Sequence, residues 1–206
     1  QTKGEYKVKK KVLAVMLTAA LATTMLFTGC GSASKGAKEA GKTTAKSGGT
    51  LNVDLPEIKT LDSAQSQDNI SATPIGAAFE GLTRANNGKM ELAAAKECKV
   101  SDDKKTYTFT LRDLNWTDGK PVTAKDFEYA WKRLVDPKTK APYSTFINGI
   151  VKNADKISEG KGNPEELGVK AKDDKTLVVT LEKPVPFFEE LIAFTALFPV
   201  RRDIVE

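Results

Sequence analysis

The residues that carry reactive side chains are few and point away from catalysis. The 206-residue chain contains no histidine, which excludes Ser-His-Asp triads, HExxH zinc sites and imidazole switches. Its two cysteines are too few for a cysteine-rich zinc site or a disulfide framework. Paired carboxylates occur at Asp102-Asp103 and Asp173-Asp174, but both pairs lie where we predict solvated hairpin turns. We therefore expect that the protein is not an enzyme and that it has no catalytic residue, metal site or cofactor.

Cys30 is the residue with the clearest predicted chemistry. It follows a basic stretch over residues 7–11 and an uncharged, largely apolar stretch over residues 12–27. Residues 26–30, Leu-Phe-Thr-Gly-Cys, resemble the bacterial lipobox, with phenylalanine where leucine is usual. The pattern predicts a lipoprotein signal peptide over residues 1–29, cleavage before Cys30 and diacylglycerol on its sulfur. The alternative, a membrane-spanning anchor with an incidental cysteine, needs about 20 apolar residues.

This segment also predicts where the protein resides. Residues 30–49 contain mainly Gly, Ala, Ser, Thr and Lys, which predicts a flexible tether. A lipid on Cys30 would hold residues 50–206 at the extracellular face of the cell membrane, and the lysine-rich tether favours a Gram-positive surface. The codon for Val8 is a candidate start codon, and if translation begins there, residues 1–7 are not translated.

The net charge of +5 arises in the N-terminal part of the chain. Residues 1–49 hold nine of the 32 basic and two of the 27 acidic residues, so residues 50–206 carry a small excess of acidic groups. This distribution implies no basic groove in the folded part. We therefore expect no nucleic-acid partner.

Apolar periodicity predicts a unit that mixes strands and helices. Residues 50–55 alternate between apolar and polar side chains, which predicts a strand that Pro56 ends. A helix is expected over residues 71–82, with Ser71 as its N-cap. The residues Asn-Asn-Gly at 86–88 indicate a turn.

Two hairpins and a central helix are predicted further along the chain. Residues 100–111 and 169–181 each combine a charged turn with an alternating strand. A helix is expected between Thr123, which with Asp126 resembles a capping box, and Pro137. Its apolar face consists of Phe127, Ala130, Trp131 and Leu134. The last predicted elements are a short helix or turn at residues 155–160 and a helix that starts at Pro186 and includes Phe194.

An ordered series of motifs runs through residues 107–137. They are Tyr107-Thr-Phe-Thr-Leu-Arg112, Asn115-Trp116-Thr-Asp-Gly-Lys-Pro-Val-Thr-Ala124, Asp126-Phe-Glu-Tyr-Ala-Trp-Lys-Arg133 and Asp136-Pro137. Shorter motifs extend the series over residues 50–204, namely Leu61-Asp62, Phe79-Glu80-Gly81-Leu82, Ala141-Pro142-Tyr143, Leu167-Gly168-Val169 and Lys183-Pro184-Val185-Pro186. The series resembles the oligopeptide-binding proteins of ABC importers, in the extracellular solute-binding family 5.

The resemblance implies an α/β fold of the periplasmic-binding-protein-like class II. In that fold two lobes, joined by hinge strands, enclose the ligand. Members of the family are more than twice as long as this chain. Residues 50–206 are therefore expected to be a truncated, partial solute-binding domain that contains only part of lobe I.

The resemblance also implies a function. An extended oligopeptide would pair its backbone with protein strands between the lobes, and the closed protein, expected to be a monomer, would deliver it to ABC permease subunits. The residues of lobe I expected beside the peptide are Glu57, Ile58 and Lys59, with Tyr129 as a further candidate. The competing interpretations are a solvated turn for Glu57 and Lys59, and a packed helix residue for Tyr129.

Other functions stay open at this point. The ligand could instead be a pheromone, a nickel complex or an oligosaccharide, or the chain could be a surface interaction fragment with no role in transport. The lack of histidine gives no support to direct nickel ligation. Cys98 stands where the family often has an aromatic residue, and we expect it to be a small buried apolar residue rather than a reactive thiol.

Overall fold

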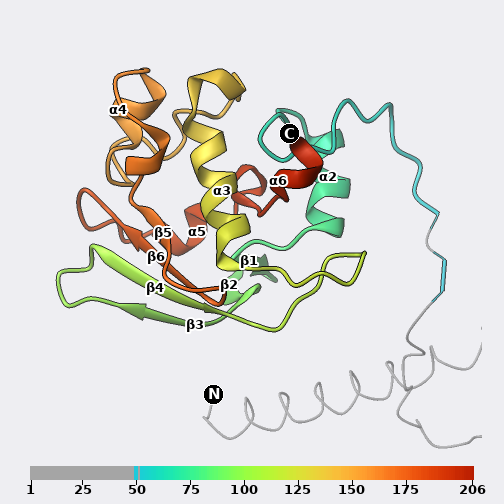
Figure 1. Ribbon diagram of the computed structural model, residues 1–206. Helices are drawn as coiled ribbons and strands as arrows, with labels where there is room; N and C mark the ends of the chain where they lie inside the picture. The colour runs from blue at the N-terminus through green and yellow to red at the C-terminus, as the bar shows by residue number, and fades with distance from the viewer. Residues whose placement is uncertain (1–48, 51) are drawn as a thin grey trace, which may run out of the picture. The chain divides into compact units, whose positions relative to one another are not determined.

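A computed structural model describes residues 49–50 and 52–206 of the chain (Figure 1). The predicted signal peptide over residues 1–29, the lipidation site Cys30 and the tether up to residue 48 lie outside the described residues. Residues 52–206 form one compact unit. Within the described residues, no helix is both long and apolar enough to cross a membrane.

The unit is built on a four-stranded antiparallel sheet with the strand order β3-β4-β6-β5. The strands are β3 (Ala95–Val100), β4 (Thr106–Leu111), β5 (Val169–Ala171) and β6 (Thr176–Thr180). Both predicted hairpins are confirmed, since β3 pairs with β4 and β5 pairs with β6. The two hairpins form one sheet because β4 also pairs with β6. Thr108 lies opposite Val178 at the centre of this pairing.

Alternation along β4 decides which face of the sheet is buried. Tyr107, Phe109 and Leu111 point into the core, whereas the threonines between them remain partly exposed. This is the pattern of a strand with one face on the core. A separate hairpin of β1 (Thr83–Asn86) and β2 (Lys89–Leu92) lies next to β3. The predicted turn at 86–88 connects these two strands, with positive φ at Asn87 and Gly88 as a tight hairpin turn requires.

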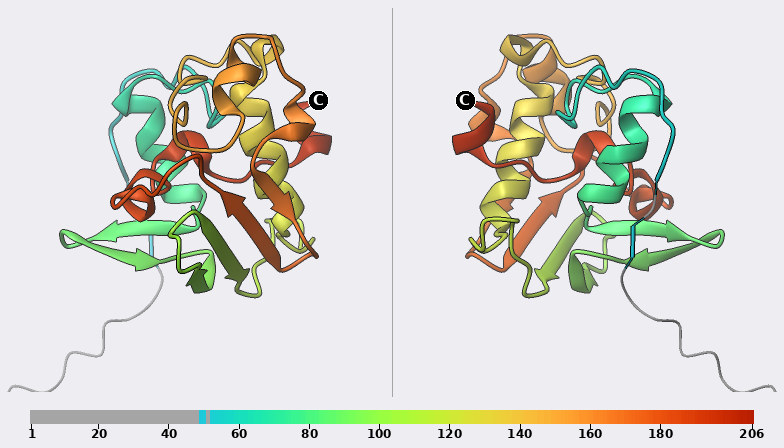
Figure 2. Two further views of the ribbon diagram at one scale, coloured as in Figure 1. Left: turned by 90° about the vertical axis from the view of Figure 1, so that its left-hand side faces the viewer. Right: turned by 90° about the vertical axis from the view of Figure 1, so that its right-hand side faces the viewer.

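Helix α3 (Ala124–Val135) packs on the buried face of the sheet against β5 and β6 (Figure 2). The predicted capping arrangement is present, because the Asp126 carboxylate accepts the backbone N–H of Thr123 at 2.7 Å. The four predicted apolar residues of this helix are all buried. Trp131 is fully buried, and its indole Nε1–H donates to the carbonyl oxygen of Leu197 at 2.8 Å.

Helix α2 (Asn69–Ala78) differs from the prediction at both ends. Asp68, not Ser71, is the N-cap, because its carboxylate accepts the Ser71 N–H at 2.8 Å and leaves Ser71 buried inside the helix. The helix ends before Phe79, which is extended, rather than at residue 82. Beyond this end, Gly81 lies directly against the ring of Phe198.

Two other predicted elements were wrong. The strand expected over residues 50–55 does not form in the part that the structure describes, because no described strand pairs with it. The helix expected from Pro186 is reduced to the single turn α5 (Phe188–Leu191), followed by the 3₁₀ helix η3 (Thr195–Leu197). A helix at the surface of a domain exposes one of its sides to water. Ala196, Leu197 and Phe198 are all buried, so consecutive residues here face the core, which a longer surface helix would not allow.

The remaining elements are short and lie around α3. The predicted helix near residue 155 is confirmed as α4 (Ala154–Ser158). The others are the 3₁₀ helices η1 (Pro137–Thr139) and η2 (Pro164–Glu166) and the terminal helix α6 (Arg202–Val205). These elements lie beside α3 and contribute charged and polar residues to the surface around it.

Gly168 offers a direct test of this packing. A Cβ there would lie 2.6 Å from the carbonyl oxygen of Thr180 and 3.1 Å from the backbone nitrogen of Lys152. We expect Gly168→Ala to lower the free energy of unfolding by about 1–3 kcal/mol, because backbone atoms cannot move aside cheaply. Urea unfolding measures this change.

Gly76→Ala is the matched control. Gly76 is exposed within α2, and a Cβ there would meet nothing within 4 Å. Alanine should raise the free energy of unfolding by about 0.5–1 kcal/mol through its higher helix propensity. Equal unfolding midpoints for both variants would contradict the close approach at Gly168.

Candidate functional site

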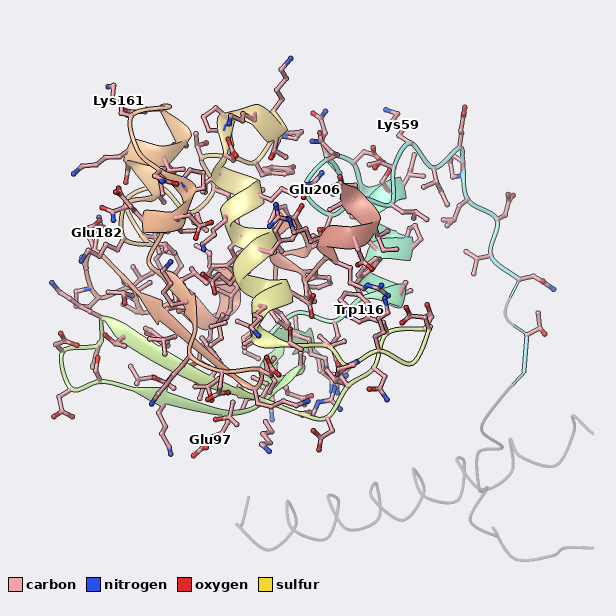
Figure 3. All side chains as sticks on the ribbon, viewed as in Figure 1. Lys59, Glu97, Trp116, Lys161, Glu182 and Glu206 are labelled. Atoms are coloured by element: carbon pink, nitrogen blue, oxygen red, sulfur yellow. The ribbon has the colours of Figure 1, made fainter. Side chains whose placement is uncertain are left out.

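The residues predicted to contact a ligand begin in an exposed segment at the start of the unit. Residues 52–61 form neither helix nor strand, and we call them the extended segment. Ile58 is 41% exposed and Leu61 is 56% exposed. The Lys59 side chain is exposed at the surface of the protein, as Figure 3 shows. Residues 52–59 make no backbone hydrogen bond to another described residue.

Asp62 is the point at which this segment enters the folded unit. Ser63 and Ala64, which follow it, are buried. One carboxylate oxygen of Asp62 accepts the Ala64 N–H at 3.0 Å, and the carbonyl of Asp62 accepts the N–H groups of Gln65 and Ser66. The Asp62 N–H in turn donates to the hydroxyl of Thr60 at 3.0 Å. Asp62 therefore closes a turn that fixes the C-terminal end of the extended segment.

An ion pair joins this turn to α3. The guanidinium of Arg133 donates from Nη1 to Asp62 Oδ1 at 2.8 Å and from Nη2 to Asp62 Oδ2 at 2.6 Å. The two side chains are only 16% and 22% exposed. This two-point hydrogen bonding to Asp62 raises the pKa of Arg133 and outweighs its partial burial. A second link comes from Gln65, whose side-chain amide donates to the carbonyl of Thr139 at 2.7 Å.

Tyr129 lies one helical turn before Arg133 on α3. Its hydroxyl donates to Glu206 Oε1 at 3.1 Å, and the guanidinium carbon of Arg202 lies 5.8 Å from the ring centroid. Burial raises the pKa of the Tyr129 hydroxyl, and the hydrogen bond to the Glu206 carboxylate adds to this effect. The phenol therefore stays neutral near pH 7, partly exposed on the polar side of the helix.

An open hollow of about 620 Å³ borders Tyr129 and Arg133. Its other walls come from η1, from η2 with the preceding Asn163, and from Arg202 and Glu206. Charged groups of both signs line it, so it attracts no single class of ion. Within the described residues, no group of three or more His, Cys, Asp or Glu side chains is placed to hold a metal ion.

The paired carboxylates near residues 102 and 173 are turn residues, as the sequence predicts. The Asp103 carboxylate accepts the Ser101 hydroxyl at 2.5 Å and the Lys105 N–H at 3.1 Å. The Asp173 carboxylate accepts the Lys175 N–H at 2.8 Å. These hydrogen bonds lower the pKa of both carboxyl groups, which keeps them ionised at neutral pH.

The structure connects the predicted ligand residues without bringing them into contact. Glu57, Ile58 and Lys59 lie on the extended segment and Tyr129 lies on α3, joined through the Asp62–Arg133 pair. Both members of this pair lie within the motifs named above, but no role was predicted for them. Their opposite charges were the only signal, and 71 positions separate them in the sequence.

Comparisons with known proteins identify the family to which this arrangement belongs. Residues 89–204, more than half of the chain, match the family model of bacterial extracellular solute-binding proteins, family 5 Middle. The chain belongs to this family. The predicted fold class is confirmed: the described α/β unit resembles part of solved family members of the periplasmic-binding-protein-like class II.

Three relatives show the range of family members that this chain resembles. It is 40% identical to the oligopeptide-binding protein OppA of Bacillus subtilis over 93% of this chain and 35% of that protein. It is 42% identical, with a TM-score of 0.71, to Listeria monocytogenes OppA bound to peptide, over 74% of this chain and 30% of that one. It is 37% identical, with a TM-score of 0.70, to the pheromone receptor PrgZ, over 74% of this chain and 30% of that one. The chain thus spans about a third of the length of the curated relative.

Cys98 combines partial burial with a position on the outer strand β3. Its thiol packs against the hydrophobic core. Burial and the nearby Glu189 carboxylate raise its pKa from 9.0 to about 11. Because the folded-state pKa is the higher one, the thiol contributes stability below pH 9 that is lost as the pH rises through about 11.

We therefore predict slow alkylation of Cys98. At pH 8 iodoacetamide should modify it about 100-fold more slowly in the folded protein than in the urea-unfolded chain, because only the thiolate reacts. Peptide mapping by mass spectrometry follows Cys98 separately from Cys30. Equal rates in the two states would show that the thiol is neither buried nor perturbed.

Proposed function

We propose that this chain is part of a substrate-binding lipoprotein that captures extracellular oligopeptides between two lobes and delivers them to an ABC peptide permease. The observation that carries the proposal is the extended segment, whose peptide groups at residues 52–59 have no described backbone partner. An extended peptide binds such an edge through main-chain hydrogen bonds, which are indifferent to side-chain identity. The proposal includes that the protein is a binding protein rather than an enzyme and works as a monomer without a cofactor.

Each predicted ligand residue has a specific role in this proposal. The backbone of Glu57, Ile58 and Lys59 pairs with the peptide, and the neutral hydroxyl of Tyr129 offers a further hydrogen-bonding group at the edge of the site. Enclosure by a second lobe is needed for affinity, because a ligand held on one wall keeps most of its surface in water.

A pheromone is the second candidate ligand. The similarity to the pheromone receptor PrgZ favours it. A pheromone that is itself a peptide would use the same main-chain pairing, and only the side-chain pockets would be narrower. The two candidates therefore differ in how many peptides the protein accepts.

The peptide proposal is tested on the intact protein purified from cells that make it. The protein is mixed with an equimolar pool of random tri- to hexapeptides, and native mass spectrometry identifies those retained. We expect many peptides of mixed sequence; one or very few would favour the pheromone function. Retention of no peptide would refute both.

A backbone variant tests the role of the extended segment. Ile58→Pro removes one backbone N–H, and we expect it to weaken binding of the retained peptides about 3- to 10-fold, the value of one main-chain hydrogen bond. Val53→Pro is the control, since residue 53 is exposed on the same segment but outside the predicted contact. Equal affinities for the two variants would argue against pairing at residues 57–59.

We also propose that diacylglycerol on Cys30 anchors the protein to the extracellular face of a Gram-positive cell membrane. The lipobox-like residues before Cys30 and the tether after it support this. Cys30→Ala should abolish incorporation of radiolabelled palmitate into the protein, whereas Cys98→Ala should leave the labelling unchanged. Continued labelling of the Cys30→Ala protein would contradict a lipid on Cys30.

A further inference from the structure

The extended segment is held to the described unit at one end. Towards its N-terminus, residues 52–59 have no backbone hydrogen bond to another described residue. At its C-terminus, Asp62 closes a turn through its own carboxylate and carbonyl groups. The position of that turn relative to the helix therefore determines where residues 57–59 lie.

Arg133 fixes the turn to the most rigid element nearby. Helix α3 is packed on the sheet, with Trp131 and Leu134 on either side of Arg133 fully buried. The planar guanidinium meets both carboxylate oxygens of Asp62, a geometry that restrains orientation as well as distance. Because both side chains are largely shielded from water, the pair is more restrained than an exposed ion pair.

The same helix carries the other predicted ligand residue. Tyr129 and Arg133 are four residues apart, so they lie on the same side of α3, one turn from each other. Both border the 620 Å³ hollow. A ligand that touches the extended segment and Tyr129 would thus bridge two elements whose described side-chain connection is the Asp62–Arg133 pair.

We propose that Asp62 and Arg133 are positioning residues that hold the extended segment in register with Tyr129 and so set the affinity for an extended peptide. This inference rests on the proposed function. Neither residue needs to touch the peptide. Without the pair, the turn would be held by the Gln65–Thr139 hydrogen bond and by the buried Ser63 and Ala64 alone. The segment would then sample more positions, and binding would have to restrain it, which weakens affinity.

The test uses Arg133→Gln, Asp62→Asn and the double variant of the intact protein, with the peptides retained from the random pool as probes. Asp62→Asn keeps a side-chain oxygen for the Ala64 N–H, so the turn itself can persist. We expect each single variant to weaken binding about tenfold and the double variant to be no weaker than either, because both remove the same contact. Arg133→Lys should recover part of the loss, since it keeps the charge but not the two-point geometry.

Lys125→Gln is the matched control. Lys125 belongs to the first turn of α3 and pairs with Asp174 at 2.9 Å, but both side chains are exposed and the pair joins the helix to a hairpin turn instead. Its removal should leave peptide affinity within twofold of wild type. Thermal unfolding of every variant separates loss of affinity from loss of folding.

The outcomes are distinct. Wild-type affinity in Arg133→Gln and Asp62→Asn, or an equal loss in Lys125→Gln, would overturn the positioning role while leaving the proposed function intact. A loss of affinity that appears only at temperatures where the variant unfolds would assign the pair a structural role alone. Failure of the wild-type protein to retain any peptide would overturn the proposed function and this inference together.

Discussion

The hydrogen bond from the buried Trp131 indole to the carbonyl of Leu197 governs the rest of the unit. A buried indole N–H needs an acceptor, and here the acceptor lies 66 positions further along the chain. This bond joins η3 to α3, and next to η3 Phe198 lies against Gly81. Arg202 and Glu206, a few residues further on, contact Tyr129 on the same helix, so residues 197–206 contact α3 through both its core and its polar surface.

Helix α3 serves two purposes on its opposite sides. The buried side fills the space over β5 and β6, which explains why its apolar residues recur at helical spacing. On the other side Glu128 accepts the Ala171 N–H at 2.8 Å and pairs with Lys132 at 2.6 Å, satisfying the outer edge of the sheet. Arg133 then binds the turn at Asp62. The polar side thus joins the helix to two segments that are far apart in the sequence.

Local patterns predicted the local elements of this fold. Alternation identified β4 and β6, and helical spacing with a capping pair identified α3, because each depends on neighbouring residues alone. The pairing of β4 with β6 was not predicted, since no local signal relates two strands so far apart. The prediction of Ser71 as N-cap was wrong, because the Asp68 carboxylate accepts the Ser71 N–H and Ser71 itself is buried within the helix. At the site, resemblance suggested Glu57–Lys59 and Tyr129, whereas the Asp62–Arg133 pair that connects them required the structure.

An extended segment without a backbone partner among the described residues is a hazard, because a second copy of the chain could pair with it. The sequence limits that risk locally. Pro56 has no N–H to donate, and the exposed charged residues Glu57 and Lys59 flank Ile58, which discourages stacking of identical strands. Both features act against open-ended pairing between copies of the chain. The composition of this segment therefore limits self-association even though its residues lie at the surface.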